Sequence, residues 1–128
     1  MQQKFRRQTA ASLRAAERRE REDGAPRLAE VVPGLRGLRL EIEERSGASA
    51  VSSPKYIRRV VVATAPALFL IPCGDPSCSD GGHDVTASVM QALRSGRTEF
   101  DGDDGCMGSI GSASCTRVLH YDAVAEYS

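Results

Sequence analysis

Four cysteines are the residues of this 128-residue sequence that are best suited to chemistry, and they form two pairs. Four residues separate Cys73 from Cys78, and eight separate Cys106 from Cys115, while His83 follows the first pair. Thiolate sulfur and imidazole nitrogen are the ligands of closed, tetrahedral zinc sites in proteins. The spacing therefore predicts a structural zinc site formed by the four cysteines, with His83 as the side chain that would replace one of them.

The segments inside each cysteine pair favour tight loops. Residues 74–77 read Gly-Asp-Pro-Ser, which is typical of a turn, and residues 107–114 are mostly small. Two such loops can approach one ion from opposite sides. Metal binding would then add to the free energy of folding, because the site does not exist in the unfolded chain.

Other states of the cysteines are also compatible with the sequence: unlinked thiols in the core, disulfides, or an iron–sulfur cluster. The first 23 residues lack the apolar segment of a secretory signal, and four acidic residues among them argue against a transit peptide. We therefore expect a cytoplasmic protein. Cysteines in that reducing compartment bind metal more often than they form structural disulfides.

The segment from Leu68 through Cys73 and Cys78 to Cys106 resembles a thioredoxin-like [2Fe-2S] ferredoxin. The resemblance covers less than half of the chain and implies an electron carrier with a [2Fe-2S] cluster. The family places its fourth cysteine four positions after the third, where this chain has Ile110, so Cys115 would have to act from a shifted position.

The first half of the chain is basic and the second half is acidic. Residues 1–64 hold 14 basic and 8 acidic side chains, whereas residues 65–128 hold 3 and 9. Residues 3–22 contain strong helix formers and neither Gly nor Pro, which predicts a helix. At 100° per residue, five basic side chains share about a third of its circumference: Lys4, Arg7, Arg14, Arg18 and Arg21.

This basic stripe suggests docking on an anionic assembly, with RNA or a ribonucleoprotein as the first hypothesis, through contacts to phosphates. An alternative is a protein–protein adaptor, in which Phe5, Leu13 and Ala16 contact an acidic protein partner. A third interpretation is a solvated helix that binds nothing.

The sequence favours a protein that is not an enzyme. It contains no phosphate-binding glycine motif, no nucleophile elbow and no deaminase motif, and no small-molecule substrate is evident. A metalloenzyme would need an open metal position, with Asp84 or Glu99 as a base. We expect His120, which lies in an apolar strand pattern, to be structural. A membrane span is not expected, because no window approaches 20 apolar residues.

Periodicity predicts an α+β fold with a mostly antiparallel sheet, one packed helix and the cysteine-rich site. Alternation predicts strands at 38–43 and 116–127, and β-branched residues predict one at 56–63. A short strand is expected at 97–100. The continuous apolar run 68–71 predicts a central strand. A short turn or helix is expected at 26–32, and a helix at 84–95 with Gly96 at its end. We expect a basic helical arm at 1–24, ended by Gly24 as a left-handed cap, and a compact metal-binding domain at 25–128.

Overall fold

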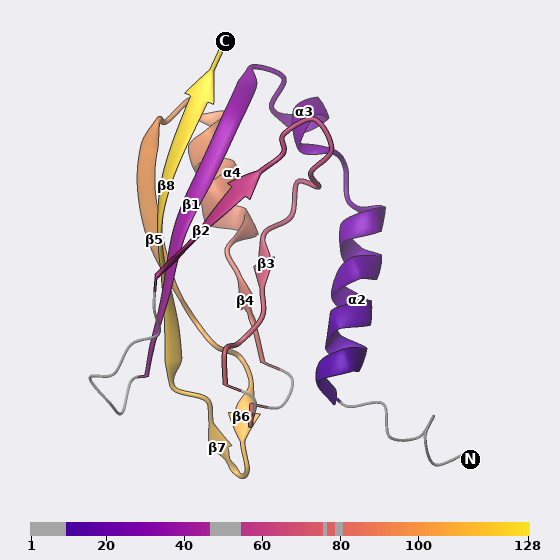
Figure 1. The fold of residues 1–128 in the computed structure, drawn as a ribbon, viewed down its shortest axis with the longest axis vertical. Helices are drawn as coiled ribbons and strands as arrows, with labels where there is room; N and C mark the ends of the chain where they lie inside the picture. The colour runs from indigo at the N-terminus through magenta and orange to yellow at the C-terminus, as the bar shows by residue number, and fades with distance from the viewer. Residues whose placement is uncertain (1–9, 47–54, 76, 79–80) are drawn as a thin grey trace.

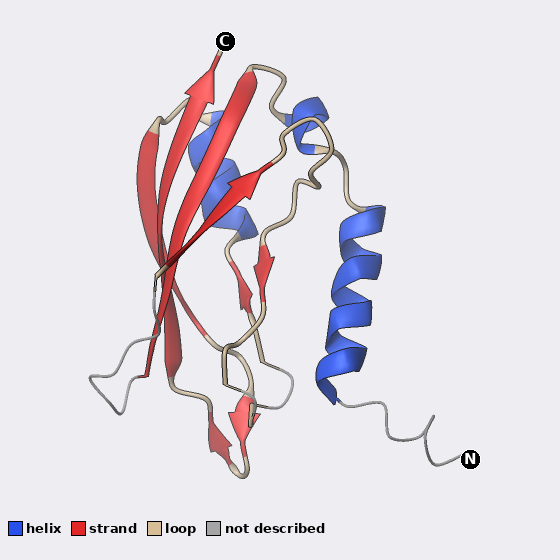
Figure 2. Ribbon diagram, viewed as in Figure 1, coloured by secondary structure: helices blue, strands red, loops and turns tan. Residues whose placement is uncertain are grey.

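The fold is an antiparallel sheet of four strands with helix α4 packed against one face (Figures 1 and 2). The computed structural model describes residues 10–46, 55–75, 77–78 and 81–128. The sheet has the strand order β2-β1-β8-β5. Its strands are β1 (Leu35–Ser46), β2 (Tyr56–Val60), β5 (Glu99–Gly105) and β8 (Arg117–Tyr127). The helices are α2 (Ala10–Gly24), α3 (Leu28–Val31) and α4 (Thr86–Arg94).

Two short hairpins complete the α+β fold, which confirms the predicted class. They are β3 (Leu70–Ile71) with β4 (His83–Asp84), and β6 (Ser109–Ile110) with β7 (Ala113–Ser114). No helix in the described residues is long and apolar enough to cross a membrane.

The long central pair of strands, β1 and β8, follows from the alternation in the sequence. Leu38, Leu40 and Ile42 of β1 are buried on one face, and so are the residues of β8 opposite them. Because side chains alternate across a strand, the residues between them lie on the other face. The β1–β8 pairing runs from Leu35 to Ser46 with one irregularity near Gly37. We call the buried face of this sheet the inner face.

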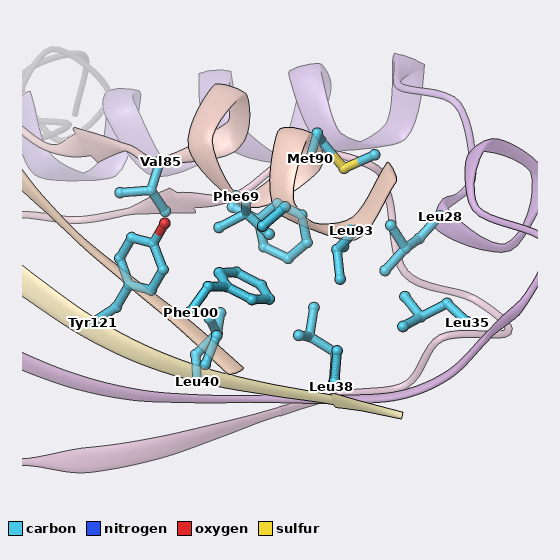
Figure 3. Packing of buried hydrophobic residues seen from close by; sticks show 14 of the residues in the cluster. Leu28, Leu35, Leu38, Leu40, Phe69, Val85, Met90, Leu93, Phe100 and Tyr121 are labelled. Atoms are coloured by element: carbon cyan, nitrogen blue, oxygen red, sulfur yellow. The ribbon is translucent and has the colours of Figure 1, made fainter. Parts of the chain in front are cut away.

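The hydrophobic core lies between the inner face and α4 (Figure 3). Val89 and Leu93 of α4 are buried, as the predicted helical face requires. Phe100 and Tyr121 pack edge to face with their ring centroids 6.4 Å apart. Gly96 ends the helix with a φ of +71°, a conformation that glycine adopts without a steric penalty. The amides of residues 96 and 97 bond to carbonyls of the last turn, which is the Schellman arrangement.

Two local predictions were wrong. The apolar run 68–71 is not a central strand: only Leu70 and Ile71 form a strand, which pairs with β4 outside the main sheet. Phe69, which precedes them, is buried in the core from a loop, so a continuous apolar run here reflects packing over the sheet. Gly24 belongs to α2, and it is not among the glycines with positive φ.

Helix α2 runs beside the β3–β4 hairpin (Figure 1). Arg27 joins its end to the domain, because its guanidinium donates to the carbonyls of Glu22, Ala25 and Thr64. Arg21 lies 3.7 Å from Asp84 in an exposed ion pair. A cavity of about 270 Å³ lies between α2 and the hairpin. The first turns predicted for this helix, residues 3–9, lie outside the described residues.

Candidate metal centre

The four cysteines lie together at one end of the sheet. Their Sγ atoms are all within 4.8 Å of one another. Two of the short approaches cross between the two sequence pairs: Cys73 to Cys115 at 3.9 Å and Cys78 to Cys106 at 3.6 Å. Four sulfurs at about 2.3 Å from one ion form a tetrahedron with edges of about 3.8 Å. This group of thiols could therefore hold a single metal ion.

Turns and strand ends position the sulfurs. Asp75 shapes the first loop, since its carboxylate accepts from the Ser77 amide and its carbonyl accepts from the Cys78 amide. In the second loop, the Cys106 amide donates to the carbonyl of Arg117, and the Cys115 amide to that of Gly108. The first bond extends the ladder between β5 and β8, and the second extends the β6–β7 hairpin, so paired strands carry these two sulfurs.

Backbone amides point at the sulfurs from both loops. The Asp75 amide donates to Sγ of Cys73 at 3.5 Å, and the Gly108 amide donates to Sγ of Cys106 at 3.4 Å. In each case the donor lies two residues after the cysteine. The Gly82 amide is a second donor to Cys106, also at 3.4 Å. Amide donors of this kind stabilise thiolates, which are the form of cysteine that binds metal.

The surroundings shift the thiol pKa values in opposite directions. Burial raises the pKa of Cys73, and burial also raises the pKa of Cys78, to about 11. Burial acts in the same direction on Cys106, but hydrogen bonds from the amides of Gly108 and Gly82 and from the thiols of Cys78 and Cys115 together outweigh it and lower the pKa of Cys106. Of these three thiols, Cys106 is the one that the protein alone holds most readily as a thiolate. The charge of a bound cation would supply the rest of the stabilisation.

His83 lies in a different environment from the four sulfurs. Its buried ring places Nε2 2.8 Å from a carboxylate oxygen of Glu44 and Nδ1 3.3 Å from one of Asp104. Glu44 is 7 % exposed, and its other oxygen accepts from the amide of Gly74, next to Cys73. Arg117 lies 3.6 Å from the same oxygen. These four side chains form a polar layer between the hydrophobic core and the thiols, and the layer fixes the backbone of the first cysteine loop.

We expect Glu44→Ala to destabilise the protein by about 3–5 kcal/mol, because it leaves Nε2 of the buried His83 without its acceptor and removes the acceptor of the Gly74 amide. Urea unfolding checks this. Glu41→Ala is the matched control, since Glu41 pairs with Lys55 at 3.5 Å in an exposed position. Its cost is expected to stay below about 1 kcal/mol. Equal losses in the two variants would contradict a structural role for the polar layer.

Sequence reasoning did not identify Glu44, although a signal was present. Leu38, Leu40 and Ile42 show which alternate residues of β1 face inward, and the same alternation places Glu44 on the inner face. A carboxylate at a buried strand position indicates a polar partner, because an unpaired buried charge is costly. Asp104 of β5 also lies on the inner face, because it is paired with the buried Leu119 of β8.

The basic residues predicted to contact nucleic acid are only partly described. Arg18 is half-buried and lines the cavity beside α2, whereas Arg21 is exposed. Arg14 belongs to α2, but its side chain is not described. Lys4 and Arg7 lie outside the described residues.

A second group of potential ligands lies on the other face of the sheet, which we call the outer face. It consists of Asp101, His120 and Asp122. Nδ1 of His120 is 2.8 Å from Asp103, and Nε2 is 3.3 Å from Asp122. The hydrogen bond to Asp103 raises the pKa of His120 above its ordinary value of 6.5, against the effect of burial, and the nearby carboxylates add to the rise.

His120 should therefore make stability depend on pH. A raised folded-state pKa means that the charged ring stabilises the fold fully below pH 6.5, and that this contribution disappears as the pH rises through the folded-state pKa. We expect an NMR titration to place the His120 pKa above 6.5. His120→Gln should lose stability at low pH and little at high pH. A titration at or below the ordinary value would contradict the ion pairs.

Comparisons with known proteins found no relative of this chain. No protein-family model matches the sequence, and searches of curated proteins and of solved structures gave no match.

Proposed function

We propose that this is a small zinc-binding protein in which the ion is structural. The observation that carries the proposal is the mutual distance of the four sulfurs, at most 4.8 Å, with two of them at 3.6 and 3.9 Å. The distances of 3.6 and 3.9 Å match the edges of one tetrahedron around zinc, about 3.8 Å. Four thiolates would fill that tetrahedron and leave no position for water or substrate, which is the pattern of structural zinc sites.

The compactness of the group favours one ion over a [2Fe-2S] cluster. Such a cluster divides its cysteines between two iron atoms, so the two pairs of sulfurs must be further apart than the edges of a single tetrahedron. An ultraviolet–visible spectrum of protein purified without oxygen tests this point. A colourless sample is expected, and the absorption bands of an iron–sulfur centre would contradict zinc.

The ion would join two loops that lie far apart in the sequence. Cys73 and Cys78 lie in the connection from β3 to β4, and Cys106 and Cys115 flank the β6–β7 hairpin beyond the sheet. The hydrophobic core lies between the sheet and α4, away from these loops. Zinc binding would therefore stabilise the end of the fold that the core does not reach.

For the rest of the molecule, we propose that α2 docks on an anionic assembly, with RNA or a ribonucleoprotein as the partner. Among the described side chains of α2 none is buried, and Arg19 and Arg21 are exposed. Because none of these side chains is buried, α2 gains little from packing on its own domain. Its exposed arginines are thus available to contact phosphates without reading sequence.

Binding of a labelled single-stranded RNA of random sequence, measured by fluorescence anisotropy, tests the docking proposal. We expect the affinity to fall steeply with salt, because phosphate contacts release counterions. Arg14→Glu with Arg18→Glu should nearly abolish binding. Arg36→Glu with Arg94→Glu, at exposed positions outside α2, is a control with the same change in charge. Unchanged binding by the α2 variant would contradict the proposal, and a partner that resists competition by RNA would indicate an adaptor.

A further inference from the structure

The two edges of the main sheet carry opposite charge. Strand order makes β2 one edge and β5 the other in the described part of the chain. Strand β2 contains Arg58 and Arg59 and no acidic residue, and Lys55 precedes it. Strand β5 has four acidic residues and no basic one: Glu99, Asp101, Asp103 and Asp104. Edge strands have unpaired backbone N–H and C=O groups and are templates for further pairing.

The directions of the strands allow these two edges to meet. All neighbours in the sheet are antiparallel, so β2 and β5 run in opposite directions. A second copy that is moved sideways in the plane of the sheet therefore brings its β5 antiparallel to β2 of the first. The inner faces of both copies stay on the same side. The product is one continuous antiparallel sheet.

Each half of the outer face contains two like charges on directly opposite residues, and such a contact would bring an opposite charge to the basic pair. Arg59 of β2 lies directly opposite Arg39 of β1, and Asp101 of β5 lies directly opposite Asp122 of β8. Among the described residues, neither Arg39 nor Arg59 forms an ion pair. Like charges opposite each other destabilise a sheet. Side chains that lie on the same face stay on it when the register shifts by two, so Arg59 can meet Glu99 or Asp101 of the second copy.

The β2 edge also has exposed apolar side chains, which a contact between two copies would bury. Ile57 and Val61 are 52 % and 66 % exposed, which is unusual for β-branched side chains in or beside a strand. Ile57 shares the outer face with Arg59, since their partners on β1 are two residues apart. A strand placed against β2 would cover part of this surface. Two copies would not pair β2 with β2 or β5 with β5, because charges of the same sign on the two edges repel each other.

We propose that the protein associates with itself head to tail, with β2 of one copy pairing to β5 of the next. The contact uses different surfaces on the two copies, so it does not close at a dimer. The proposal is independent of the metal and of α2, since no cysteine and no residue of that helix takes part.

Sedimentation equilibrium of the full chain from micromolar to millimolar concentration tests it. We expect the average mass to rise from 13.7 kDa beyond that of a dimer, and added salt to reverse the rise. Arg59→Glu and Asp101→Lys, each alone, should weaken association by about 100-fold, because each brings like charges together. Arg94→Glu and Glu30→Lys, at exposed positions away from both edges, are the matched controls.

A mixture of the two edge variants gives the sharpest result. Each variant pairs poorly with itself, because its altered residue has the same sign of charge as the edge it must meet. In the mixture, the glutamate that Arg59→Glu introduces at β2 can meet the lysine that Asp101→Lys introduces at β5, so the two variants should associate. A monomer at all concentrations, a mass that stops at the dimer, or no recovery in the mixture would each overturn the proposal. Unchanged metal content and circular dichroism would establish that the variants are folded.

Discussion

Gly81→Ala is expected to lower the metal affinity of this protein by at least about 100-fold. The backbone of Gly81 packs closely against three of the four cysteine side chains. A Cβ atom at this position would overlap Sγ of Cys78 and lie 2.8 Å from Sγ of Cys106 and 3.3 Å from Cβ of Cys73. Two ligand sulfurs would have to move, and a tetrahedral site tolerates little displacement of its ligands. Competition with a chromogenic zinc chelator measures the affinity.

Gly105→Ala is the matched control for this prediction. Gly105 is adjacent to Cys106, but a Cβ atom there would meet nothing within 4 Å. Both changes add one methyl group beside the same loop, so a loss of affinity in Gly81→Ala alone is due to crowding of the sulfurs. Equal affinities in the two variants would indicate that the thiols do not hold the metal as proposed.

Cys115→Ser is expected to lower the free energy of unfolding by at least about 4 kcal/mol, which corresponds to loss of a ligand present at 1,000 times its dissociation constant. The thiol of Cys115 is buried and 3.9 Å from that of Cys73. Serine cannot replace a thiolate as a soft ligand for zinc. For a domain of this size the melting temperature should fall by roughly 15 °C, as thermal unfolding followed by circular dichroism can measure.

Met107→Ser is a suitable control for the cysteine variant. It also replaces a sulfur-containing side chain with serine, at a position next to Cys106, but Met107 is 88 % exposed. We expect a change of less than about 0.5 kcal/mol. The melting temperature of the wild type in excess EDTA should approach that of Cys115→Ser. If Cys115→Ser melts like the wild type, the site does not contribute to folding.

The parts of the fold that follow from local patterns were predictable. The alternation at Leu38, Leu40 and Ile42 predicted β1 and its buried face, and the apolar spacing at 85–93 predicted α4. Gly96 predicted the end of that helix, because few other residues adopt its φ. Each of these signals depends on residues within one turn or one strand, so no tertiary information is needed to interpret them.

The wrong prediction for 68–71 has a tertiary cause. A continuous apolar run is equally compatible with a central strand and with a loop that packs over the core. Phe69 is 1 % exposed in a loop, because the inner face of the sheet and α4 leave a space that this ring fills. Nothing in the run itself distinguishes these two ways of burying it.

The candidate site was predictable in its residue types and not in its arrangement. The turn residues inside the cysteine pairs indicated two loops that could converge. The contacts of Cys73 with Cys115 and of Cys78 with Cys106 depend on how the end of the sheet and the β6–β7 hairpin place the second pair beside the first loop. The same sheet brings Glu44 under Gly74, over a sequence distance that no short pattern spans.

X-ray absorption at the zinc edge, on protein purified without added metal, tests the central claim most directly. We expect one zinc per chain with four sulfur neighbours at about 2.3 Å and no nitrogen or oxygen in the first coordination shell. A nitrogen neighbour would indicate that His83 replaces a cysteine. Folded protein without zinc would contradict the claim that four thiolates and one ion hold this end of the molecule together.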